Sequence, residues 1–259
     1  MLNRQLKIAS WNVNSVTVRG PQVVDWMLAH HIDVMAIQET KVTDDKFPAH
    51  YFTEHGFHLA FTGQKTYNGV ALISRLPLSD VYIESSDILE RRIIAATIQD
   101  IRVVNFYVPN GSEVASDKYR YKLRWLEAAT AFLSQQHQRF PKLIVMGDFN
   151  IAPQDRDVHD PEAWRDAILV SPLERAALAG VQHIGLYDSF RSCHPNRQDY
   201  SWWDYRAASF RRNLGLRIDL ILLSDALLSQ CETADIDANT RKHERPSDHA
   251  PVWISLKVP

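Results

Sequence analysis

Residues 143–150 read LIVMGDFN, an apolar run that ends in an acid and an amide. Short apolar runs that are rich in β-branched residues are typical of buried strands. The pattern recurs along the chain: similar runs reach Asn12, Glu39 and Tyr107, and others open at Asp219 and at Asp248-His249. If the strands that end in polar residues run antiparallel to the strands that begin with them, all these polar side chains meet at one sheet edge. Carboxylates packed together repel one another, so the cluster predicts a divalent cation and a metal-dependent enzyme.

The composition indicates a soluble protein with a large core. The chain has 259 residues, of which 45% are apolar and 23% are charged. Chains of this length often form one domain, and we expect a single domain over residues 1–259. Cys193 and Cys231 share no metal-ligand spacing, and the sequence has no run of about 18 uncharged residues that could cross a membrane. We therefore expect a soluble, cytoplasmic protein without a membrane partner.

The charge distribution leaves a nucleic-acid partner open. A net charge of −2 argues mildly against one, because domains that bind nucleic acids tend to be basic. The basic residues are nevertheless gathered at 91–92, 118–124, 206–217 and 241–245. A local basic rim is compatible with phosphate binding, although each cluster alone is also typical of a solvated helix face or loop.

Strand-like and helical patterns alternate along the sequence. Apolar runs predict strands at 7–11, 34–38, 58–61, 70–74, 93–98, 102–107, 143–146, 200–205, 218–223 and 252–256. Three helices are expected between them: one at 22–30 that starts at Pro21, one at 118–138 capped by Asp117, and one that starts with the capping box Ser171 to Glu174. Strand pairs mixed with helices favour two packed sheets with helices outside.

The acids at the strand ends have ordinary structural explanations as well as chemical ones. Asp148 and Asn150 could only shape a turn. Glu39 follows a buried-looking strand, where an unpaired carboxylate is costly, but it could also be exposed or paired with Lys41.

The histidine and the aromatic residues also leave two readings open. A lone histidine at a strand entrance is usually structural, whereas His249 stands beside several acids, and Asp219 could orient it. Tyr107 could present its phenol at the sheet edge or lie in the core. Trp202 and Tyr205 could stack on a base or sugar, or fill a sheet face.

Taken as a set, these residues resemble the exonuclease III family of AP endonucleases, within the endonuclease/exonuclease/phosphatase superfamily. The resemblance extends from Ile8 to Leu256. It is carried by SWNVNS at 10–15, IQETK at 37–41, YNGVA at 67–71, RRII at 91–94, GDFNIAP at 147–153, LRID at 216–219 and SDHAPV at 247–252. Many ordered motifs with compatible separations make chance agreement improbable.

The resemblance implies a fold and an activity. The fold is a four-layer α/β sandwich, deoxyribonuclease I-like, with two mixed sheets flanked by helices and a cleft at their common edge. Family members hydrolyse DNA phosphodiesters at abasic sites and at 3′ ends, using Mg²⁺ or Mn²⁺. We therefore expect 3′-5′ exonuclease and 3′-phosphatase activity with AP endonuclease activity, in a monomer that binds double-stranded DNA.

The resemblance also implies a role for each matching residue. Glu39 corresponds to the principal metal ligand, and Asp148 to the residue that orients or deprotonates the attacking water. The candidate metal ligands are Asn12, Glu39, Asp148, Asn150, Asp248 and His249, and the candidate catalytic residues are Tyr107, Asp148, Asn150, Asp219 and His249. An all-oxygen set suits Mg²⁺, whereas zinc would favour more Cys or His.

Contacts to DNA are expected from basic, amide and aromatic side chains around the cleft. The candidates are Arg91, Arg92, Asn110, Lys118, Trp202, Leu216 and Ile218, of which Trp202, Leu216 and Ile218 match the family's pocket for an extruded abasic sugar. The chain departs from many relatives at Leu216, where they carry an aromatic residue. The stretch 154–173, another variable part of the family, could obstruct or admit duplex DNA.

Two other classes of protein compete with this hypothesis. The same core could serve a phosphatase acting on phosphoinositide or sphingolipid head groups, but no membrane-binding helix is evident in the sequence. A DNA-binding protein without catalysis is disfavoured, because acids gathered without a metal would weaken the binding of phosphate.

Overall fold

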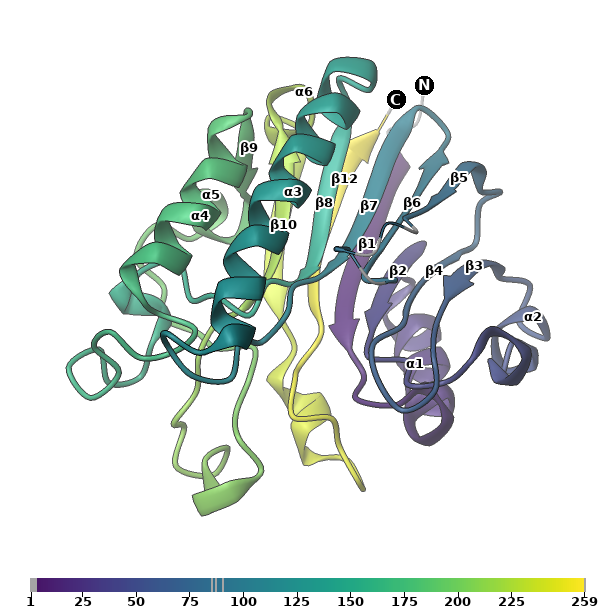
Figure 1. Cartoon of the computed structure of the whole chain (residues 1–259). Helices are drawn as coiled ribbons and strands as arrows, with labels where there is room; N and C mark the ends of the chain where they lie inside the picture. Colours follow the sequence, from purple (N-terminus) through teal and green to yellow (C-terminus); the bar gives the residue numbers. More distant parts are fainter. Residues whose placement is uncertain (1–3, 85, 87, 90, 259) are drawn as a thin grey trace.

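The computed structural model describes residues 4–84, 86, 88–89 and 91–258, and it contains two six-stranded mixed sheets (Figure 1). The first sheet has the order β11 (Cys231–Ile236), β12 (Val252–Val258), β1 (Arg4–Asn12), β2 (Val34–Gln38), β4 (Val70–Ser74) and β3 (His58–Thr62). The second has the order β5 (Ser79–Ile83), β6 (Ile93–Ile98), β7 (Ile101–Tyr107), β8 (Leu143–Asp148), β10 (Asp219–Ser224) and β9 (Leu186–Asp188).

Helices cover the outer faces of both sheets. These are α1 (Val16–His30) and α2 (His50–Thr53) on the first sheet, and α3 (Asp117–Arg139) and α4 (Pro172–His183) on the second. Two short helices, α5 (Ser189–Cys193) and α6 (Asp225–Leu228), instead contribute Phe190 and Leu227 to the core between the sheets. Figure 1 shows α1 and α2 on one side and α3 and α4 on the other. Short 3-10 turns at Asp44–Lys46, Asp155–Asp157, Arg206–Ala208 and Ala238–Lys242 lie in the connections.

Three apolar cores hold the layers together. Residues such as Ile8, Ala36 and Ile144 pack between the two sheets. One outer core joins the second sheet to α3 through Trp125, and the other joins the first sheet to α1 through Met27. The order helix, sheet, sheet, helix confirms the four-layer sandwich.

The strand directions bring the polar strand ends to one edge. β1 is parallel to β2, and β7 is parallel to β8, so the carboxyl ends of these pairs point the same way. β12 runs antiparallel to β1, and β10 runs antiparallel to β8 with Asp219 directly opposite Asp148. The antiparallel arrangement expected from the sequence is therefore confirmed.

Two predicted helix starts are wrong, and one is confirmed. Helix α1 begins at Val16 and contains Pro21 in its interior, because its buried apolar face packs on the first sheet and outweighs the missing proline N–H. The N-cap of α3 is Ser116, whose Oγ accepts from the backbone N of Tyr119 at 3.1 Å, so Asp117 is the first helical residue rather than the cap. The capping box of α4 is present as predicted, with Ser171 at the N-cap.

The strand predicted at 200–205 is also wrong. Within this segment Trp202 forms isolated bridges to Leu216 and to His249, and the chain otherwise crosses the end of the sheets. The aromatic residues that gave a strand-like pattern pack in small clusters at the sheet edge instead, with Trp203 against Phe210. Strands β5, β9 and β11 went unpredicted, because β5 is exposed throughout, β9 is three residues long and β11 is only partly buried.

None of the helices in the described part of the chain is both long and apolar enough to cross a membrane.

Candidate active site

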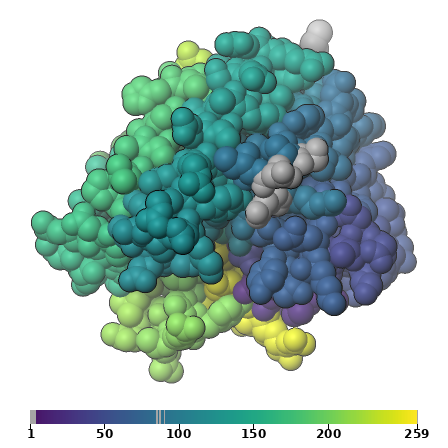
Figure 2. All heavy atoms as spheres, in the orientation of Figure 1, coloured from purple at the N-terminus to yellow at the C-terminus, as the bar shows by residue number. Residues whose placement is uncertain are grey.

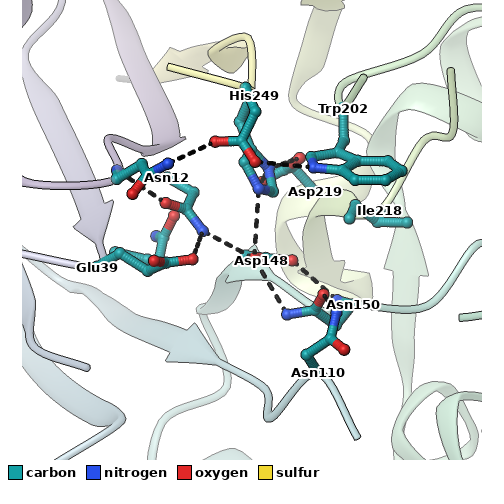
Figure 3. A network of polar contacts seen from close by, with 12 residues as sticks. Asn12, Glu39, Asn110, Asp148, Asn150, Trp202, Ile218, Asp219 and His249 are labelled. Atoms are coloured by element: carbon teal, nitrogen blue, oxygen red, sulfur yellow. Dashed lines mark hydrogen bonds and ion pairs between the residues drawn. The ribbon is translucent and has the colours of Figure 1, made fainter. Parts of the chain in front are cut away.

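Two carboxylates and one imidazole converge at the common edge of the two sheets (Figure 3). Glu39 follows β2 of the first sheet, Asp148 ends β8 of the second, and His249 precedes β12. One ligand atom of each lies within 4.8 Å of the other two. This is the convergence that the sequence pattern predicted.

Asn12 ties the two carboxylates together. Its amide nitrogen donates to Oε1 of Glu39 at 2.8 Å and to Oδ2 of Asp148 at 2.9 Å. Its amide oxygen accepts from the backbone N of Asn14 at 3.0 Å. In this arrangement Asn12 holds the acids as a donor, so its expected role as an oxygen ligand to a metal does not fit its contacts.

A buried ion pair orients the imidazole of His249. Its Nδ1 lies 2.9 Å from Oδ2 of Asp219, which also accepts from the Ser201 hydroxyl at 2.6 Å. Burial alone would lower the pKa of His249, but Asp219, followed by Asp148 and Asp248, raises it to about 10. The ring is therefore an imidazolium at neutral pH, and its Nε2 lies 3.8 Å from Oδ2 of Asp148.

The pKa of Asp148 is also strongly shifted from its usual value. Complete burial raises its pKa, His249 lowers it, and Asp219 and Glu39 raise it further, to about 7. The backbone N of Asn150 donates to its Oδ1 at 2.9 Å, and the amide of Asn150 donates to its Oδ2 at 3.2 Å. A carboxyl group with this pKa can take and release a proton near neutral pH.

Glu39 remains ionised and is held in a strained backbone conformation. Burial acts to raise its pKa, but the ammonium of Lys41, 2.8 Å from Oε2, together with Asn12 and His249, lowers it below its usual value. The backbone φ of Glu39 is 55°, in the left-handed region that L-residues seldom adopt. The strain is maintained by its neighbours, because the carbonyl of Glu39 accepts from the backbone N of Ser15 at 2.7 Å.

A polar bridge between the sheets lies directly behind Glu39. The amide of Gln38 donates to Oγ of Ser10 at 3.0 Å and to Oδ1 of Asn105 at 2.8 Å, across the inter-sheet core. Asn105 in turn donates to the carbonyls of Ile37 and Ala71 at 2.9 Å. These bonds fix the first sheet against the second where Glu39 must face Asp148.

The donor set fits a hard divalent cation. Glu39 and Asp148 each offer a carboxylate oxygen, and a ring nitrogen of His249, whose Nδ1 contacts Asp219, lies within 4.8 Å of them. Mg²⁺ is usually held by one or two carboxylates and keeps several waters. The residues present therefore match Mg²⁺ better than zinc.

Asp248 and Asn150, also expected as ligands, have their side chains engaged elsewhere. The two oxygens of Asp248 accept from Nδ2 of Asn14 at 3.0 Å and Nε1 of Trp202 at 3.1 Å. Burial acts to raise the pKa of Asp248, but His249, Trp202 and Asn14 lower it. Asn150 donates to the Val108 carbonyl at 2.9 Å, and its Oδ1 accepts from the amide of Asn110 at 3.2 Å.

A hollow of about 520 Å³ opens beside Glu39. Among its lining residues are Arg92, Tyr107, Asn110 and Lys118, four of the residues predicted to act on the substrate. Figure 2 shows the surface hollowed where the blue β3–β4 connection faces the teal segment that precedes α3. Burial, followed by Glu39, raises the pKa of Tyr107 well above its usual value, so its hydroxyl stays protonated and can donate.

Arg91 and Arg92 differ in position. The guanidinium of Arg92 lies over the ring of Tyr107, 4.5 Å from its centroid, at the wall of the hollow. Arg91 instead donates to Thr62 Oγ1 at 3.2 Å and to the Gly63 carbonyl at 3.3 Å, and it lies outside the lining of the hollow. Arg91 is still half-exposed at the rim.

Trp202 forms a platform on the other side of the cluster. Its ring lies over Ile218 in Figure 3, while its Nε1 is held by Asp248. Leu216 and Ile218 are 0% and 1% exposed, packed with Val158 and Leu169 beneath the surface. Their predicted direct contact with DNA is not available in this structure, since Trp202 covers them.

Several residues of the site escaped sequence reasoning. Asn14 and Ser201 hold Asp248 and Asp219. The SWNVNS stretch that contains Asn14 predicted no separate role for it, and Ser201 belongs to no motif. Lys122 is completely buried behind the cleft, although its place in a basic stretch of the sequence indicated a solvated helix face. Asn68 lines the hollow, and the YNGVA stretch at 67–71 that contains it predicted no role for its side chain.

Comparisons with known proteins agree with this geometry. A profile of the Endonuclease/Exonuclease/phosphatase family matches residues 9–249. The chain is 33% identical to exodeoxyribonuclease III of Haemophilus influenzae over 267 residues, which cover 97% of this chain and 100% of the relative. Among solved structures, a 3′ phosphatase from Neisseria bound to a product DNA hairpin superposes with a TM-score of 0.96 at 44% identity, covering 98% of this chain and 100% of the other. An AP endonuclease from Archaeoglobus fulgidus gives a TM-score of 0.93 at 37% identity, with 98% and 100% covered.

Proposed function

Since the chain belongs to the exonuclease III family of AP endonucleases, within the endonuclease/exonuclease/phosphatase family, we propose that it is a metal-dependent nuclease acting at the 3′ ends of DNA. The observation that carries the proposal is the meeting of Glu39, Asp148 and His249 within 4.8 Å at the end of a basic, aromatic hollow. The proposal includes removal of a 3′ phosphate, because in that reaction too water attacks a phosphorus atom at the end of the DNA.

Two side chains have the properties that hydrolysis of a phosphodiester requires. Asp148, held in place by Asn12 and Asn150, orients the attacking water and accepts its proton. His249, kept as an imidazolium by Asp219, donates from Nε2 to a phosphate oxygen and stabilises its negative charge.

The remaining polar groups hold the substrate in place. Tyr107 donates its phenolic proton at the wall of the hollow, while Arg92 and Lys118 attract the DNA backbone. Asn150 acts by fixing Asp148, because its amide already donates to Asp148 and to the Val108 carbonyl.

We propose that the metal is Mg²⁺, that Mn²⁺ can replace it, and that Glu39 and Asp148 hold the ion. When bound, it would neutralise the phosphate oxygens and the leaving oxygen. Asn12 keeps the two carboxylates at a fixed separation through its bonds to both.

Incision 5′ of abasic sites, a monomeric state and a cytoplasmic location belong to the same proposal. The relative from Archaeoglobus fulgidus named as an AP endonuclease supports the first. Trp202 offers a platform on which an extruded sugar could rest, with Leu216 and Ile218 as its support. The monomer and the location stay predictions from the sequence.

The decisive experiment compares three DNA duplexes. One carries a recessed 3′ end, one a 3′ phosphate and one an abasic analogue, each incubated with Mg²⁺ or with EDTA. We expect metal-dependent processing of the first two at least, and its loss in an Asp148→Asn variant. Failure on all three, or faster hydrolysis of a soluble inositol phosphate, would overturn the proposal.

A further inference from the structure

An ion pair with no exposed surface lies directly behind the cleft. Lys122 of α3 and Glu174 of α4 are each 0% exposed and in contact through Nζ and Oε1. Burying two charges is costly, and an apolar pair of similar size often stabilises a fold equally well. The pair therefore calls for an explanation other than the packing of two helices.

The contacts of Lys122 lead towards the site. Its ammonium donates to the carbonyl of Asn110 at 3.1 Å and to that of Asn150 at 2.7 Å, as well as to Glu174. These three acceptors use all three of its N–H donors. Its stem also closes the space under Gly111, where an added Cβ would lie 3.1 Å from Cδ of Lys122.

Glu174 anchors the ammonium from the opposite side. Its Oε1 accepts from the backbone N of Leu169 at 3.1 Å, and its Oε2 accepts from the backbone N and the hydroxyl of Ser171 at 3.1 Å and 2.6 Å. The carboxylate is therefore fixed by the start of α4 and cannot follow Lys122 if the loops move.

Both carbonyls bound by Lys122 belong to asparagines of the cleft. The side chains of Asn110 and Asn150 bond to each other at 3.2 Å, and Asn150 holds Asp148 through both its backbone N and its amide. Asn150 itself has a left-handed φ of 50°, which its surroundings must maintain. A single buried ammonium thus joins the loop of Asn110, which lines the hollow, to the segment of Asn150, which holds Asp148.

We propose that Lys122, anchored by Glu174, is a positioning residue that sets the two cleft loops and through them Asp148 for hydrolysis. The inference rests on the proposed nuclease function. A positioning residue can be distinguished from a purely structural one. Loss of a purely structural ion pair changes the free energy of unfolding alone, whereas loss of a positioning residue lowers the rate at which bound DNA is hydrolysed.

The test replaces the pair without leaving a lone buried charge. The double variant Lys122→Met/Glu174→Gln removes both charges and retains one acceptor for the backbone at the start of α4. The matched control is Lys142→Met/Asp100→Asn, which neutralises an exposed pair, 2.5 Å apart, between the start of β8 and the β6–β7 turn. The single variant Lys122→Met is less informative, because it leaves the buried carboxylate of Glu174 without a positive partner and can unfold the chain.

We expect a loss of turnover with little loss of binding. A displacement of about 1 Å at a catalytic group can cost roughly a hundredfold in rate, so kcat for a recessed 3′ end should fall about a hundredfold. KM, and the Kd for a DNA hairpin measured in EDTA, should change by less than about threefold, because the basic rim is untouched. The control should retain the wild-type kcat.

A folded double variant with the wild-type kcat would overturn the inference, and so would a control that loses as much activity. Hydrogen exchange gives a readout that does not depend on activity: backbone amides at 110–112 and 149–152 should exchange faster in the double variant alone. The two hypotheses can fail independently. If the wild type cuts no DNA, the proposed nuclease function is wrong. If hydrogen exchange in these loops is the same in the double variant as in the wild type, the positioning role of Lys122 is wrong.

Discussion

The substitution Asp148→Asn should make the metal-free protein more stable while abolishing its activity. Burial raises the pKa of Asp148 from 3.8 to about 7, so the folded state holds this proton more tightly than the unfolded chain. Ionisation of Asp148 therefore costs folding free energy. The cost is absent below pH 3.8, grows as the pH rises towards 7 and is constant above that.

The size of the effect follows from the same shift. A difference of about three pKa units corresponds to about 4 kcal/mol at pH 8, as an upper limit. The variant loses charge-assisted bonds from Asn12 and Asn150, which offsets about 1–2 kcal/mol. We expect a net gain of about 2 kcal/mol at pH 8 and about none at pH 4.5.

The assay is urea unfolding, followed by tryptophan fluorescence in EDTA at pH 4.5 and pH 8. Asp25→Asn, on the exposed face of α1, serves as the control and should change stability by less than about 0.5 kcal/mol at both pH values. Added Mg²⁺ should remove the advantage of the variant, because the cation stabilises the wild type only. Equal or lower stability of Asp148→Asn at pH 8 would refute the reasoning about its pKa.

Three further predictions concern other parts of the molecule. Asp219→Asn removes the anion that does most to hold the pKa of His249 near 10. We therefore expect kcat to fall about a hundredfold to ten-thousandfold, and the alkaline limb of the pH–rate profile to move to lower pH. Trp202→Ala should weaken binding of single-stranded DNA ends in EDTA by about 1–3 kcal/mol, as measured by fluorescence anisotropy. Oxidised glutathione should join Cys193 to Cys231, whose sulfurs lie 4.0 Å apart, with a loss of two hydrogens in the intact mass; a Cys231→Ser variant should not show it.

The sequence predicted the arrangement of the strands because the signals for it are local. Runs such as 143–150 show both that a strand is buried and which end carries polar groups, so the meeting of Glu39, Asp148 and His249 followed from strand direction alone. The role of Asp219 beside His249 was also predicted, since both open strands at the same edge.

The rest depends on contacts between segments that lie far apart in the sequence. Lys122 resembles any helical lysine until Glu174 and the carbonyl of Asn150 are placed around it. The direction in which Asn12 turns its amide, which decides between donor and ligand, also depends on the position of neighbouring side chains. The aromatic residues near Trp202 misled the strand prediction, because aromatic enrichment does not distinguish a strand from a loop packed on a sheet edge.

The division of the cleft between two sheets has a consequence for the cell. Glu39 stands on one sheet and Asp148 on the other, while His249 comes only just before the last strand. A chain still on the ribosome, or one that has collapsed into half its structure, therefore lacks the means to break DNA. The capacity to hydrolyse DNA therefore appears only once both sheets have formed and His249 lies beside Glu39 and Asp148.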